Sequence, residues 1–148
     1  MPDEYIYIAP PEPRRSDQVV PLAVRRLKKE MSDRMVYKVP DAAADIMVDP
    51  EDLKEVYEIY FDESRKNLSA CCAALAKGDW KGVAKLAHAV KGASSNLRIH
   101  SIRYLAELLE LHAKSGKTEA ISVLLLALCK EFDTVRTEVQ RYFHTAKF

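Results

Sequence analysis

The chain has 148 residues, of which 48% are hydrophobic and 30% charged, and its formal net charge is +1 at pH 7. This length and composition predict one domain with a substantial core, and the near-zero charge argues against a dedicated nucleic-acid-binding protein. No apolar run reaches the roughly 18 residues that a membrane-spanning helix needs, and the first residues do not resemble a signal peptide. We therefore expect a cytoplasmic protein with no membrane insertion. Its three cysteines show no metal-type spacing and are expected to be buried thiols.

Residues 1–40 differ from the rest of the chain, because five of the seven prolines lie at or before Pro21. Apolar residues then recur every three or four positions from Val24 to Met35, with basic residues between them, which predicts a basic amphipathic helix. We expect this helix to pack on its own domain rather than on a membrane. The sequence thus divides into an N-terminal extension, residues 1–40, and a helical domain, residues 41–148, with residues 39–45 as the connection.

Capping signals divide the helical domain into four long amphipathic helices. Asp49 followed by Pro50 favours the start of a helix that runs to about Lys77, and Gly78 favours its end. Asp79 then caps a second helix, which runs from Trp80 to about Arg98.

The two remaining helices have similar signals. Ser101 is the expected cap of the third helix, and Thr118 is that of the fourth, after a break at residues 115–117. Four helices joined by short turns predict an all-α fold, an antiparallel up-down four-helix bundle with an additional N-terminal helix.

The second helix carries a histidine on its polar face. On a helical wheel its apolar residues gather within roughly 40° of the pole opposite His88, so the imidazole should face solvent. These apolar residues are Val83, Leu86, Val90, Ala93 and Leu97. The predicted neighbours of His88 on the exposed face are Lys81, Ala84, Lys85, Lys91, Gly92 and Ser95.

This pattern favours phosphoryl transfer over a structural role for His88. Gly92 costs a helix interior about 0.5–1 kcal/mol relative to alanine, but it leaves room for another molecule to approach. The Lys91 ammonium can lean back over the imidazole, because side chains tilt toward the helix N-terminus. No second metal-ligating residue lies on that face, so we expect no metal site.

Other polar candidates in the sequence have weaker support. His100, His112 and His144 fit ordinary structural roles, and the pair Glu107 and Glu110 reads as solvated helix surface. No glycine-rich phosphate loop is present, so the sequence shows no ATP site.

The segment Ala87–Leu97, preceded by Leu75–Trp80, resembles the signature of histidine-containing phosphotransfer (HPt) domains, and the likeness covers roughly residues 45–143. The resemblance implies a phosphorelay intermediate of two-component regulatory systems, in which His88 carries a phosphoryl group between aspartates of response-regulator receiver domains. Lys91 would stabilise that group. The expected partners are receiver domains, a hybrid sensor kinase, or both. The chain would have no ATP-dependent kinase activity and no cofactor of its own, since Mg²⁺ is expected on the receiver.

The resemblance has one notable departure at the end of the motif. Where such domains commonly have glycine after the Asn-Leu pair, this chain has Arg98. The arginine either adds a basic contact for a partner or narrows the choice of partner. Six cations lie between Lys77 and Arg103, against the single Asp79. Such a patch is either only a solvated face or a docking site, and an acidic protein surface is the partner that it would suit.

Two other functions stay open at this point. The chain could be a non-catalytic module with an HPt-like fold that binds a receiver without turnover, and Arg98 and residues 1–40 would support that function. It could also be the dimerisation and phosphoacceptor part of a sensor kinase, but 148 residues leave no room for the ATP-binding domain. That third function predicts an obligate dimer, whereas we expect a monomer.

Overall fold

A computed structural model of the chain describes residues 36–116 and 118–148, and within these ranges the secondary structure is entirely helical. The predicted basic helix over residues 24–35 lies outside the described residues. The helices are α2 (Val39–Ile46), α3 (Lys54–Ala76), α4 (Trp80–Asn96), α5 (His100–Lys114) and α6 (Ile121–Phe143). Two short 3₁₀ helices, η1 (Pro50–Leu53) and η2 (Thr118–Ala120), lead into α3 and α6.

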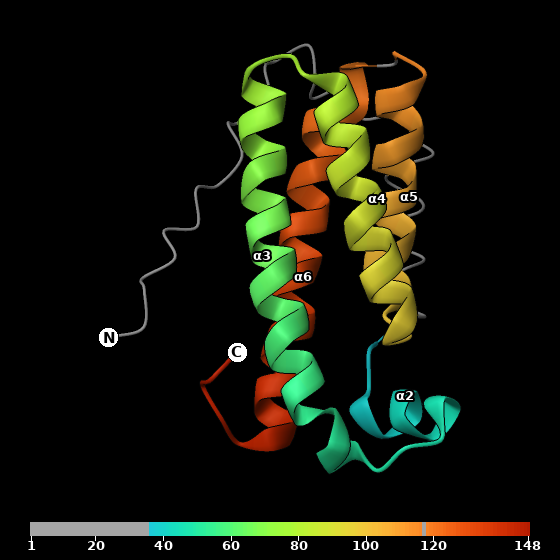
Figure 1. The fold of residues 1–148 in the computed structure, drawn as a ribbon, viewed down its shortest axis with the longest axis vertical. Helices are drawn as coiled ribbons and strands as arrows, with labels where there is room; N and C mark the ends of the chain where they lie inside the picture. The colour runs from blue at the N-terminus through green and yellow to red at the C-terminus, as the bar shows by residue number, and fades with distance from the viewer. Residues whose placement is uncertain (1–35, 117) are drawn as a thin grey trace.

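Helices α3 to α6 form the antiparallel four-helix bundle that the sequence predicts (Figure 1). The local signals at the top of the bundle act as expected. Gly78 ends α3 with a positive φ of 68°, and the Asp79 side chain accepts a hydrogen bond from the Gly82 amide at the start of α4. A connection of three residues therefore places α3 and α4 side by side.

The predicted caps of the last two helices are wrong. Ser101 lies inside α5, where its buried hydroxyl donates a hydrogen bond to Glu131 of α6 at 2.9 Å. Thr118 begins η2 instead of capping a long helix, and α6 begins after Ala120 without a side-chain cap. Both helices are held by burial of their apolar faces rather than by side-chain caps.

The segment interpreted as a connection, residues 39–45, forms most of helix α2. This helix crosses the predicted boundary at residue 40 and lies below the lower ends of α4 and α5 in Figure 1. Just before it, the Tyr37 hydroxyl donates to the carbonyl oxygen of Leu97 at 3.0 Å and pairs with the Tyr57 hydroxyl at 2.5 Å. These bonds attach the start of α2 to α3 and to the end of α4.

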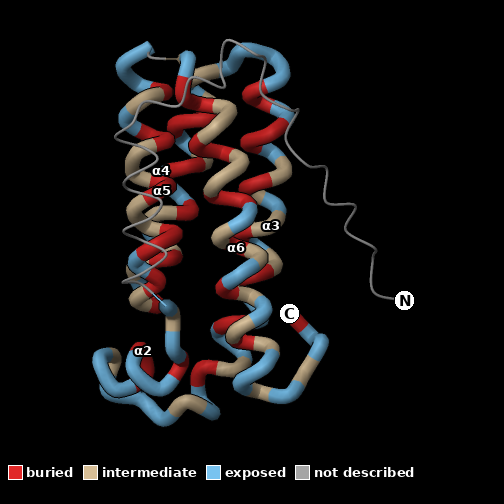
Figure 2. Tube along the Cα trace, turned by 180° about the vertical axis from the view of Figure 1, so that it is seen from behind, coloured by how far each residue is buried: buried red, intermediate tan, exposed pale blue. Residues whose placement is uncertain are grey.

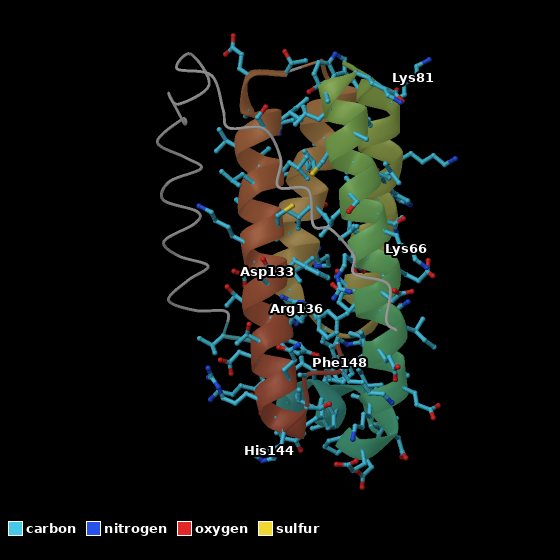
Figure 3. All side chains as sticks on the ribbon, turned by 90° about the vertical axis from the view of Figure 1, so that its left-hand side faces the viewer. Lys66, Lys81, Asp133, Arg136, His144 and Phe148 are labelled. Atoms are coloured by element: carbon cyan, nitrogen blue, oxygen red, sulfur yellow. The ribbon has the colours of Figure 1, made fainter. Side chains whose placement is uncertain are left out.

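The core runs the whole length of the bundle, with buried positions turned inward on all four helices (Figure 2). The three cysteines are buried free thiols within it. Aromatic rings fill the lower end, where the C-terminal residue Phe148 folds back between α6 and α3 (Figure 3). Its ring lies 5.6 Å from that of Phe61 and 6.0 Å from that of Phe143, centroid to centroid. The tail after α6 is therefore packed against the bundle.

Within the described residues no helix has both the length and the apolarity to cross a lipid bilayer.

Candidate functional site

His88 lies at the middle of α4 with its side chain 66% exposed, as its position opposite the apolar stripe predicts. Of that stripe, Val83, Val90 and Leu97 are buried, while Leu86 and Ala93 are half-buried against the core. The helix therefore holds the backbone of His88 rigidly while the imidazole meets solvent.

Glu110 of α5 is the main feature of the site that the sequence interpretation missed. Its side chain is only 6% exposed, and its Oε1 lies 3.0 Å from His88 Nδ1. The interpretation of Glu110 as solvated surface was wrong. The sequence interpretation considered only the exposed face of α4, whereas this carboxylate comes from the neighbouring helix α5.

Two lysines share the Glu110 carboxylate with His88. Lys114, one turn further along α5, donates a hydrogen bond to Oε1 at 2.8 Å, and the Lys91 ammonium lies 2.9 Å from Oε2. Burial raises the pKa of Glu110, but contacts with Lys114, Lys91 and His88 outweigh that effect and lower the pKa to about 2. The carboxylate is therefore charged at neutral pH and can only accept hydrogen bonds.

An ionised Glu110 fixes the tautomer of a neutral His88. Since the carboxylate has no proton to give, Nδ1 must carry the hydrogen in this bond, and the free lone pair is on Nε2. The site thus presents one imidazole nitrogen as a nucleophile and holds the other in a charged hydrogen bond.

Of the predicted neighbours of His88, some are exposed as expected and one is buried. Lys81 and Lys85 are exposed on α4, and a Cβ atom added to Gly92 would meet nothing within 4 Å, so the space that the glycine was expected to leave is present. Ala84, in contrast, is buried against the core and cannot contact a partner. The Ser95 hydroxyl donates to the Lys91 carbonyl oxygen at 2.9 Å.

Arg98 lies at the lower end of α4 and contacts α2 rather than His88. Its Nε donates to Asp45 Oδ2 at 2.5 Å, and both residues line a shallow pocket between α2 and the start of α5. Its φ of 58° lies in the left-handed region, which a glycine would adopt without strain.

The basic surface is smaller than the sequence suggests. Lys91, Arg98 and Arg103 are each paired with a carboxylate, of Glu110, Asp45 and Glu107 respectively. The other three, Lys77, Lys81 and Lys85, are exposed and form no ion pair within the described part of the chain. Figure 3 shows Lys81 at the upper end of the bundle. Positive charge therefore gathers above His88, toward the N-terminus of α4.

The other histidines stand apart from this site. His100 is the exposed first residue of α5, His112 bonds through Nδ1 to the Leu108 carbonyl oxygen at 2.9 Å, and His144 ends α6. Across residues 36–116 and 118–148, no three or more histidine, cysteine, aspartate or glutamate residues are grouped so that they could hold a metal ion.

The neighbours of Glu110 on α5 contain a signal that could have revealed its burial. Ala106 and Ala113, one turn before and one turn after it, are both buried. Small residues on one edge of a helix let a second helix approach closely, and α4 also carries two buried alanines, Ala84 and Ala87. A glutamate between two alanines on such an edge is covered by the neighbouring helix rather than by water.

Comparison with protein families agrees with this arrangement. The family model described as Hpt domain matches residues 55–145, which covers α3 to α6 and both His88 and Glu110. No curated protein and no solved structure shows a significant match to the chain. Hpt domains are phosphotransfer carriers of two-component signalling that interact with receiver domains and kinases, generally without kinase activity of their own. Because the match spans more than half of the chain, this protein belongs to the Hpt domain family.

Proposed function

We propose that this protein is a phosphorelay intermediate, in which His88 accepts a phosphoryl group from a phospho-aspartate of one receiver domain and passes it to an aspartate of another. The observation that carries the proposal is the exposed imidazole whose Nδ1 is bonded to buried Glu110, which leaves Nε2 free to attack. Residues 41–148 form the phosphotransfer domain in this proposal, and residues 1–40 are an extension to it.

The transfer step follows from this tautomer. The Nε2 lone pair attacks the phosphorus of the aspartyl phosphate, an N–P bond forms, and the acyl O–P bond breaks with its electron pair going to the aspartate carboxylate. The ring becomes positively charged because Nδ1 keeps its proton. Glu110, 3.0 Å from Nδ1, stabilises that charge, and Lys91 neutralises the phosphoryl oxygens.

The surface around His88 supports docking of an acidic receiver across α4 and α5. Lys81 and Lys85 on α4 and Lys114 on α5 surround the upper side of the histidine, and Gly92 leaves an open approach below it. Leu111, 56% exposed beside Glu110, adds an apolar contact. Any Mg²⁺ would be held by the receiver, because the carboxylate nearest to His88 is occupied by His88, Lys91 and Lys114.

The test is transfer of labelled phosphate from a phosphorylated receiver domain to wild-type protein, His88→Gln and His100→Gln. We expect acid-labile label on the wild type and on His100→Gln, whose histidine lies outside the site, and none on His88→Gln. Label on His88→Gln would overturn the assignment of the phosphoacceptor. Binding of the phosphorylated receiver without loss of its phosphate would favour a non-catalytic binding module instead.

A further inference from the structure

The Glu110 carboxylate has two lysine partners, and the two contacts differ. Lys114 makes a hydrogen bond to Oε1, the same oxygen that accepts from His88 Nδ1. Lys91 forms an ion pair with Oε2 at 2.9 Å, and no other described residue bonds to that buried oxygen. The two lysines also come from different helices, since Lys91 is on α4 and Lys114 is on α5.

Phosphorylation of His88 changes what Lys91 can contact. The phosphoryl group on Nε2 carries close to two negative charges and lies in solvent beside a lysine three residues along the same helix. Lys91 has to move away from Oε2 to surround those oxygens, because the Glu110 carboxylate it contacts is bonded to Nδ1 and the phosphoryl group is on Nε2, the other ring nitrogen. A buried carboxylate left without any cation is strongly disfavoured, so a second cation has to stay when Lys91 moves.

We propose that Lys114 is a positioning residue that holds Glu110 through Oε1 while Lys91 exchanges from Oε2 to the phosphoryl group on His88. This inference rests on the proposed function of His88. Lys114 can perform this role because its ammonium contacts Oε1, the oxygen that also accepts from His88 Nδ1, at 2.8 Å, so this contact does not depend on the position of Lys91. With Lys114 in place, Glu110 keeps one cation and one ring proton in both states of the histidine.

The experiment compares Lys114→Met, Lys114→Gln and Lys114→Arg with wild type, using phosphoramidate as a small phosphodonor so that docking does not enter the rate. Arg141→Met is the matched control, because Arg141 is an equally exposed cation, 70% exposed, paired with Glu138 on the same helix far from His88. Three quantities are measured for each protein: the rate of His88 phosphorylation, the half-life of phosphohistidine, and the tautomer of His88 from the ¹⁵N shifts of its ring.

We expect Lys114→Met and Lys114→Gln to slow phosphorylation about tenfold, equivalent to ~1.4 kcal/mol, to shorten the phosphohistidine half-life and to reduce the Nδ1–H tautomer. Lys114→Arg should restore all three, and Arg141→Met should match wild type. Circular dichroism checks that each variant is folded. A Lys114→Met protein with wild-type rate and tautomer overturns the inference about Lys114 alone, whereas absence of label on wild-type His88 overturns the proposed function itself.

Discussion

At the scale of single residues, the candidate site depends on one carboxylate whose environment the sequence does not reveal. Helical periodicity identifies the exposed face of α4 and the place of His88 on it, because both are properties of one helix. It does not show where the next helix lies. Ala84, about 40° from His88 on the wheel, faces α5 and is buried, and Glu110 faces α4 and is buried as well. Ala84 and Glu110 were both interpreted as exposed, and both are buried by contacts between helices that the pattern of a single helix does not show.

Glu110 should make the stability of the protein depend on acidic pH. Its pKa is lowered from 4.5 to about 2 in the folded protein, so its contribution to the free energy of unfolding is complete above about pH 4.5 and is lost as the pH falls toward 2. The shift corresponds to ~3 kcal/mol. Urea unfolding between pH 6 and pH 2 should show a steeper loss of stability for wild type than for Glu110→Gln.

Glu107→Gln is the control for this measurement. The Glu107 carboxylate lies in a surface ion pair with Arg103 at 3.3 Å, which contributes little to stability. This variant should follow the wild-type curve. If Glu110→Gln follows it too, the buried carboxylate is not held by the charges around it.

At the scale of elements, the sequence identified those helix ends whose signals are local. Asp79 and Gly78 act through bonds and torsions within a few residues, so their pattern alone predicts the turn between α3 and α4. Ser101 resembles a cap in sequence, yet its hydroxyl bonds to Glu131, thirty positions away. Helix α2 was missed because it has only eight residues and begins after Lys38 without a side-chain cap, so no capping residue marks its start.

Substitution of Gly92 by alanine should raise the stability of the protein and lower the rate of phosphoryl transfer from a receiver domain. A Cβ at this position would meet nothing in the folded protein, so Gly92→Ala should raise the free energy of unfolding by about 0.5–1 kcal/mol through helix propensity. Transfer from a receiver domain should slow, because the added methyl group occupies the approach to His88. Phosphorylation by phosphoramidate, which needs no docking, should stay at the wild-type rate. Equal transfer from the receiver in both proteins would mean that no partner comes this close to α4.

At the scale of the whole molecule, the sequence predicts the four-helix bundle but not the packing that covers the lower end of its core. Four long apolar stripes and short turns are compatible with few arrangements besides an antiparallel bundle. The lower end, in contrast, is closed by residues from both ends of the described chain, Tyr37 and Phe148, which meet the ring of Tyr57. Ring contacts between residues so distant along the chain produce no periodic pattern in the sequence from which they could be predicted.

Phe148 should therefore contribute to global stability although it follows the last helix. Its side chain is buried among Tyr57, Phe61 and Phe143, and Gln140 donates a hydrogen bond to its carbonyl oxygen at 2.9 Å. Phe148→Ala should lower the free energy of unfolding by about 3 kcal/mol, measured by urea denaturation. Tyr142→Ala, at a half-exposed position on α6, should cost about 1 kcal/mol or less. Similar losses in the two variants would show that the tail does not belong to the core.

The bond between His88 and Glu110 ties the reactive ring to two helices at once, and neither end of that bond is on a loop. Because both helices are fixed, the His88 ring can move little except by rotation about the bonds of its own side chain. In the proposed relay the protein would therefore serve as a rigid support, and the binding partner would supply the movements that align donor and acceptor. Relaxation-dispersion NMR of the free protein should accordingly find the backbone around residue 88 quiet on the microsecond-to-millisecond timescale.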